Sequence, residues 1–124
     1  MKRLILALAA SLTLATPLMA APGDMNVATF LGKADVLKAK GAAALFSSDI
    51  KVLRTEGQAA GEAYRARLNA ERAAGKPSSC PPKGTKVNSD KLLAFLRTYP
   101  ENVRPRVSMK QAMADYFIRN YPCR

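Results

Sequence analysis

Apolar residues recur at intervals of three and four positions along most of this chain, the spacing that places them on one face of a helix. No stretch keeps the alternation of two that a β-strand requires. The pattern predicts about four helices and an all-α fold, with helices over residues 26–40, 48–74, 88–99 and 108–121. Residues 41–46 form a short alanine-rich turn between the first two helices.

Each predicted helix begins beside a residue whose side chain can cap its free backbone N–H groups. Ser108 and Gln111 have the spacing of a capping box for the last helix. The candidate caps of the four helices are Asp24 or Asn26, Ser48 or Asp49, Asn88 or Ser89, and Ser108.

The inward face of the long helix is nearly bare of side chains in its middle. Gly57 and Gly61 lie one turn apart, so the face lets another element approach its backbone closely. We expect a second helix to pack there, and the same glycines also fit a slot that admits a ligand or a partner's loop. The face consists of Ile50, Leu53, Gly57, Ala60, Gly61, Tyr64 and Leu68.

The last two helices share an ending, in which a phenylalanine is followed by an arginine and a Tyr-Pro pair. It occurs at 95–100 and again at 117–122. Because proline cannot continue a helix, both helices stop there. We expect the aromatic residue to anchor the last turn in the core and the arginine to face the negative end of the helix.

The first twenty residues have the features of a secretory signal peptide. Lys2 and Arg3 precede an apolar stretch that is too short to span a bilayer, and small residues follow Pro17. We expect cleavage after Ala20, with Ala21 a close alternative, and export to the periplasm. Residues 21–124 then form a single domain, and an uncleaved N-terminal anchor is the competing interpretation. No later apolar run reaches the roughly 20 residues of a membrane helix, so no membrane span is expected.

Cys80 and Cys123 are the only cysteines. An exported chain with an even number of cysteines is expected to pair them, and the spacing suits neither a redox motif nor a reactive thiol. The sequence therefore predicts one disulfide that ties the loop before residue 88 to the C-terminus. A compact helical bundle closed by this bond is the expected architecture.

The composition argues against catalysis. The chain has no histidine, and its nine acidic residues are scattered. The usual general base and most zinc sites are thus missing, and no nucleotide-binding motif occurs. We expect no enzyme, no cofactor and no metal. The net charge of +11 becomes +9 once Lys2 and Arg3 are removed, which favours anionic partners of the cell envelope over nucleic acid. A simple solvated surface is the more common reason for such dispersed charge.

Three motifs in the second half of the chain occur in a recognisable order: Cys80-Pro81-Pro82, then Phe95-Leu96 with Tyr99-Pro100, and Tyr121-Pro122-Cys123 at the end. The segment 61–64, Gly-Glu-Ala-Tyr, precedes them. Together they resemble the Rap/Tai family of amidase immunity proteins associated with type VI secretion. The resemblance implies an exported, helical, disulfide-bonded protein that binds a secreted peptidoglycan amidase and blocks its active site.

The connections at 81–86 and 101–106 are the predicted partner-binding segments. Both contain proline and the first is tied at Cys80, so each loses little conformational entropy on entering a cleft. Their cations could steer an acidic partner. The alternative is that both segments are ordinary solvated loops. The sequence also leaves open whether the protein forms a homodimer. The cations are Lys83, Lys86, Arg104 and Arg106.

Overall fold

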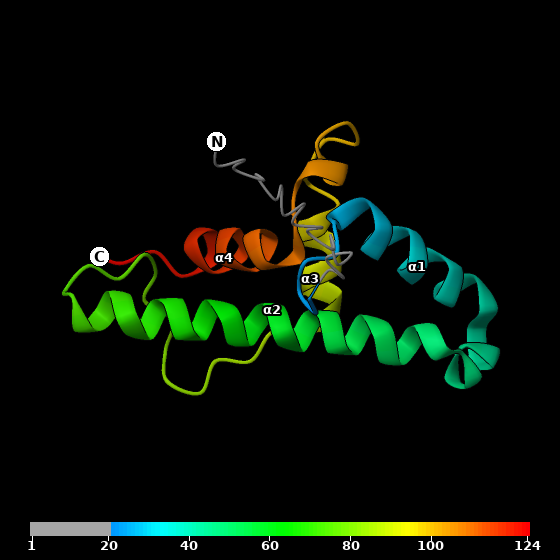
Figure 1. Cartoon of the computed structure of the whole chain (residues 1–124), viewed down its shortest axis with the longest axis horizontal. Helices are drawn as coiled ribbons and strands as arrows, with labels where there is room; N and C mark the ends of the chain where they lie inside the picture. The colour runs from blue at the N-terminus through cyan, green and yellow to red at the C-terminus, as the bar shows by residue number, and fades with distance from the viewer. Residues whose placement is uncertain (1–20) are drawn as a thin grey trace, which may run out of the picture.

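The computed structural model describes residues 21–124, and the predicted signal peptide lies outside the described residues. This part of the chain is all-α, as predicted, with four α-helices and two short 3-10 helices (Figure 1). The elements are α1 (Val27–Lys40), η1 (Gly41–Phe46), α2 (Ser48–Ala73), α3 (Ser89–Leu96), η2 (Arg104–Arg106) and α4 (Met109–Asn120).

Three of the four helices begin at a predicted cap. The Asn26 side chain accepts from the backbone N–H of Thr29 at 2.8 Å, and Asn88 accepts from two N–H groups of α3. Ser108 accepts from the N–H of Gln111 at 3.1 Å, while the Gln111 amide donates to Asp115 at 2.8 Å, so only half of the capping box forms. Helix α2 begins at Ser48 as expected, but its cap is Ser47.

Helix α2 is the spine of the molecule. Helix α4 runs beside its second half, and α1 lies at an angle to its first half, joined to it by the turn at η1 (Figure 1) and by the ion pair of Lys33 with Asp49. Helix α3 crosses behind the centre. At about 1.5 Å per residue, the 26 residues of α2 extend over roughly 39 Å and the 12 of α4 over roughly 18 Å. Helix α4 therefore covers only part of α2.

The hydrophobic core lies where the start of α1, the second half of α2, α3 and α4 meet. Backbone pairing closes one side of it: Val27 donates to the carbonyl of Val107 at 2.9 Å, and Met109 donates to that of Met25 at 2.8 Å. The buried apolar residues of this core are Val27, Phe30, Leu31, Ala60, Tyr64, Leu68, Leu92, Leu96, Met109, Ala112, Met113, Ala114 and Tyr116.

The predicted role of the aromatic residues in the repeated helix ending is confirmed. The predicted role of the first arginine is wrong. The rings of Phe95 and Tyr99 lie 5.7 Å apart, as do those of Phe117 and Tyr121. Arg97, however, pairs with Asp35 of α1 at 2.7 Å instead of facing its own helix end. The carboxylate lies within reach of the guanidinium because α1 packs against α3, and the pKa of Asp35 falls below its ordinary value through this hydrogen bond.

The carbonyls at the end of α3 accept from a different arginine. Arg104 donates to the carbonyl oxygens of Tyr99 and Arg97, each at 2.9 Å. The guanidinium fork reaches both acceptors because η2 folds back over the end of the helix. Beside it, the Tyr99 hydroxyl donates to Asp115, and burial together with this bond raises the pKa of Tyr99 above its ordinary value.

Candidate protein-binding face

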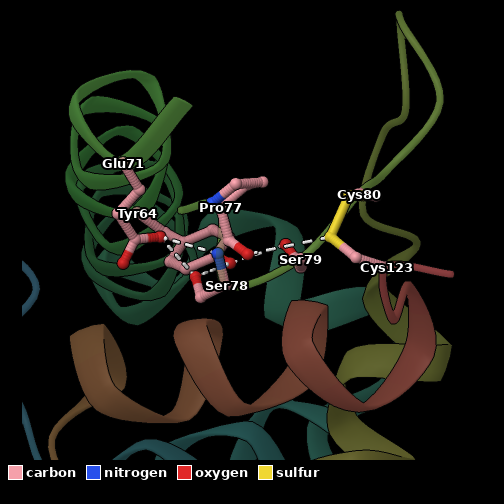
Figure 2. Close-up of a disulfide and its surroundings, with 7 residues drawn as sticks. All are labelled: Tyr64, Glu71, Pro77, Ser78, Ser79, Cys80 and Cys123. Atoms are coloured by element: carbon pink, nitrogen blue, oxygen red, sulfur yellow. Dashed lines mark hydrogen bonds between the residues drawn. A yellow bond between two sulfur atoms is a disulfide. The ribbon is translucent and has the colours of Figure 1, made fainter. Parts of the chain in front are cut away.

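The predicted disulfide between Cys80 and Cys123 is formed, with their Cα atoms 4.9 Å apart (Figure 2). The Cys80 N–H also donates to the carbonyl of Tyr121 at 2.7 Å, so the two segments are joined twice. The Cys123 sulfur lies 3.7 Å from the carbonyl of Pro77. Because a disulfide sulfur carries no hydrogen, this is a packing contact and not a hydrogen bond.

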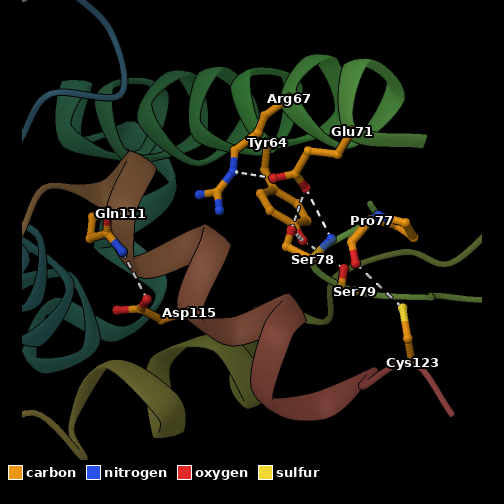
Figure 3. A network of polar contacts seen from close by, with 9 residues as sticks. All are labelled: Tyr64, Arg67, Glu71, Pro77, Ser78, Ser79, Gln111, Asp115 and Cys123. Atoms are coloured by element: carbon orange, nitrogen blue, oxygen red, sulfur yellow. Dashed lines mark hydrogen bonds and ion pairs between the residues drawn. The ribbon is translucent and has the colours of Figure 1, made fainter. Parts of the chain in front are cut away.

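A polar network fixes the chain just before Cys80. The Tyr64 hydroxyl lies 2.9 Å from the Ser78 hydroxyl and 2.6 Å from that of Ser79, which is fully buried (Figure 3). Glu71 accepts from the N–H of Ser78 at 3.1 Å, from its hydroxyl, and from Arg67 at 3.0 Å. The pKa of Glu71 is lowered, first by the Ser78 hydroxyl and then by Arg67. The loop therefore leaves α2 along a defined path.

Residues 81–86, which we call the tethered loop, rise from this anchor as a narrow turn (Figure 2). Both the N–H and the hydroxyl of Thr85 donate to the carbonyl of Pro82, at 3.1 and 2.6 Å. Gly84 adopts a φ of +80°, a conformation that a residue with a Cβ rarely takes. Lys83 and Lys86 are exposed. The loop is thus held in shape at its base and at its turn while its cations face solvent.

The structure does not bring the four predicted cations together. The tethered loop precedes α3 and residues 101–106 follow it, so the two segments lie at opposite ends of that helix (Figure 1). Arg104 is already engaged by the carbonyls of α3. Arg106 is exposed and donates only at 3.4 Å to the carbonyl of Asn102. Lys83 and Lys86 therefore form one candidate site, and the 101–106 segment forms a separate one.

The prediction of a close helix contact at Gly57 and Gly61 is wrong. A Cβ atom added to either residue would meet no neighbouring atom within 4 Å. Both glycines line an open groove of about 900 Å³, which we call the glycine groove. It forms because α3 packs towards α1 and α4 and leaves this part of α2 uncovered. The slot that the same glycines also suggested is the arrangement that the structure has.

The walls of the glycine groove are apolar and come from three elements. Helices α1 and α2 and the segment through α3 provide them, and Met113 of α4 reaches the groove as well. The sequence pattern had indicated the α2 members Ile50, Leu53, Gly57 and Gly61 as inward-facing, but it did not indicate which other elements border them. The apolar wall residues are Phe30, Ala34, Leu37, Ile50, Leu53, Val87, Leu92 and Leu93.

The groove and the tethered loop belong to one face of the molecule. A second hollow, of about 770 Å³, lies between the tethered loop and α2 and is lined by Tyr64, Leu68 and Phe117 among others. Gly61 and Arg65 line both hollows, so the two adjoin. A partner that contacts the loop therefore lies next to the groove.

Two large apolar side chains are largely exposed to solvent at the turn between α1 and α2. Leu45 is 77% exposed and Phe46 is 93% exposed; we call this pair the apolar tip. Lys40 directly precedes the turn, and Lys51 lies in the first turns of α2. The sequence interpretation had treated these residues only as a connection, because an apolar residue in a short turn is equally compatible with burial.

No family model, curated protein or solved structure matches the chain. None of the helices between residues 21 and 124 has the length and apolar character needed to cross a membrane. In the same residues, no three acidic or cysteine side chains gather where they could hold a metal ion.

Proposed function

We propose that this protein is a periplasmic immunity-type binding protein that inhibits a secreted peptidoglycan amidase, and that it does so by binding rather than by catalysis. The observation that carries the proposal is the tethered loop: a projecting turn, anchored at its base by the disulfide and presenting two free lysines. The order of the Cys-Pro and Tyr-Pro motifs, which resembles the Rap/Tai immunity proteins, supplies the class of partner.

The rigidity of the loop suits insertion into a cleft. A flexible segment loses conformational freedom on binding, at about 0.5–1.5 kcal/mol for each side chain that becomes immobilised, in addition to the ordering of its backbone. Here the bonds from Thr85 to Pro82 and from Cys80 to Tyr121 already order the backbone. Less conformational entropy is then lost when the loop enters a cleft.

The charge of the loop supports fast recognition of an acidic rim. Lys83 and Lys86 make no ion pair within residues 21–124, so their field is not cancelled locally. Exposed charges at an interface act mainly on the rate of encounter, and salt screens them. The association rate with the amidase is therefore expected to fall as ionic strength rises.

The test uses the mature protein and a Cys-His peptidoglycan amidase secreted by the same organism. We expect tight binding and inhibition, and a reduced association rate for Lys83→Glu/Lys86→Glu. A matched control reverses two lysines far from the loop, Lys40→Glu/Lys51→Glu, and keeps the same net charge. Equal association rates for the two variants would contradict the role of the loop. Absence of binding to any such amidase would contradict the proposal as a whole.

A second candidate function, docking on an anionic envelope surface, is favoured by the apolar tip. Exposed Leu45 and Phe46 flanked by Lys40 and Lys51 combine an inserting element with charges that attract anionic head groups. Cosedimentation with phosphatidylglycerol vesicles tests it. If docking operates, Leu45→Ser/Phe46→Ser releases the protein from the vesicles while the tethered-loop variant stays bound. Failure of the wild-type protein to sediment with these vesicles would exclude it.

A further inference from the structure

Gly57 and Gly61 lower the stability of α2, and no packing contact within the described chain compensates for this loss. A glycine inside a helix is about 1 kcal/mol less favourable than alanine. Such a cost is normally offset where a neighbour packs against the bare backbone, yet a Cβ at Gly57 or Gly61 would meet nothing within 4 Å. Within the described chain, the space above these residues is unfilled.

The shape and lining of the groove suit a helix. Three apolar walls flank a floor that lacks side chains at Gly57 and Gly61, so an incoming backbone can approach α2 more closely than usual. An amphipathic helix that lays its apolar face into such a groove is a recurring mode of peptide recognition. A volume of about 900 Å³ accommodates the side chains of such a face.

The charged residues at the rim of the groove indicate which charge a bound element would carry. Lys38, Arg54 and Arg65 line it, and none of them makes an ion pair within residues 21–124. Glu62 is the single acidic residue among those that line the groove. Positive potential at a rim complements negative charge on the flanks of the bound element.

A second copy of this chain fits the rim poorly. Residues 21–124 carry eighteen Lys and Arg against nine Asp and Glu, so two copies repel each other. We propose that the glycine groove is a docking site for an amphipathic helix with acidic flanks, supplied by a partner protein. The groove adjoins the hollow beside the tethered loop, but the proposal does not depend on the partner being an amidase.

The test measures binding of a synthetic amphipathic helix to the mature protein by fluorescence anisotropy. The probe is a labelled peptide of about 18 residues, roughly 27 Å as a helix, with leucines on one face and glutamates on its flanks. Two matched peptides serve as controls: one carries lysines in place of the glutamates, and one has the same composition in scrambled order. We expect the acidic helix to bind at least about tenfold more tightly than either control.

Two variants assign this binding to the groove. Gly57→Leu/Gly61→Leu fills the groove and is expected to weaken binding of the acidic helix by about tenfold or more, whereas Gly32→Leu, on an exposed part of α1 outside the groove, leaves it unchanged. Arg54→Glu/Arg65→Glu changes only exposed side chains and should reverse the preference towards the lysine peptide. The rim variant keeps the test decisive if the leucine variant does not fold.

Several results would overturn the proposal. Equal binding of the scrambled peptide would show that attraction is non-specific, and unchanged affinity in both groove variants would place the peptide elsewhere. A dimer in sedimentation that Gly57→Leu/Gly61→Leu dissociates would assign the groove to a second copy. Displacement of the acidic helix by a lysophospholipid at equal or lower concentration would assign it to a lipid. None of these outcomes bears on the proposed binding of an amidase by the tethered loop.

Discussion

Replacing the groove glycines by alanine should make the protein more stable. Each of Gly57→Ala and Gly61→Ala gains the difference in helix propensity, about 1 kcal/mol, and the new methyl group meets no atom within 4 Å. Residues four apart on a helix have Cβ atoms about 5–6 Å apart, so the two methyl groups do not clash and the gains add to about 2 kcal/mol. In a small domain, each kcal/mol of added stability raises the melting temperature by about 4–8 °C.

The assay is urea unfolding of the oxidised mature protein, followed by circular dichroism and read as the shift of the midpoint at constant m-value. Gly32→Ala, on the exposed side of α1, is the matched control and should gain a similar amount. The opposite assumption, a helix packed against the glycines, predicts overpacking and a loss of about 1–3 kcal/mol. A loss at Gly57 or Gly61 together with a gain at Gly32 would therefore refute the open groove.

Three further predictions concern the anchor of the tethered loop. Cys80→Ser/Cys123→Ser should lower the free energy of unfolding by about 4 kcal/mol, the loop-closure value for a separation of 43 residues, measured by urea unfolding; a loss below about 1 kcal/mol would contradict this. Tyr64→Phe removes the hydrogen-bond partner of the buried Ser79 hydroxyl and should cost about 1–3 kcal/mol, with no change expected if the hydroxyl finds another partner. Glu71→Gln should destabilise at neutral pH. Because the folded pKa of Glu71 lies below its ordinary value of 4.5, the stabilisation is present above that pH and the difference from wild type should close as pH falls below it; a constant difference from pH 7 to pH 3 would contradict this.

The sequence was a good guide to local features. Asn26, Asn88 and Ser108 act as caps because capping depends only on the next three residues. The Tyr-Pro ending is confirmed for α4, which stops at Asn120, whereas α3 already stops at Leu96, three residues before Tyr99. Proline restricts only its immediate neighbour, so it sets the latest possible end of a helix and not the actual one. The disulfide could be predicted from the expectation of export and from the cysteine count, which require no knowledge of the packing.

Features that depend on distant pairing could not be derived from the sequence. The periodicity of α2 gives the direction in which Gly57 and Gly61 face, but not whether another helix covers them. Coverage depends on the length of α2, which exceeds that of α4, and on α3 packing away from it. Arg97 pairs with Asp35, which lies 62 positions away in the sequence. Because the Arg97 side chain is engaged there, the carbonyls at the end of α3 accept from Arg104 instead.

Hydrolysis of peptidoglycan by the secreted amidase, measured with increasing amounts of the mature protein, tests the central claim most directly. The account predicts that hydrolysis stops near one molecule of this protein per amidase. It also predicts that Lys83→Glu/Lys86→Glu needs more protein or more time to reach the same inhibition, whereas Lys40→Glu/Lys51→Glu behaves like wild type. Unchanged hydrolysis at a large excess of the wild-type protein would contradict the account.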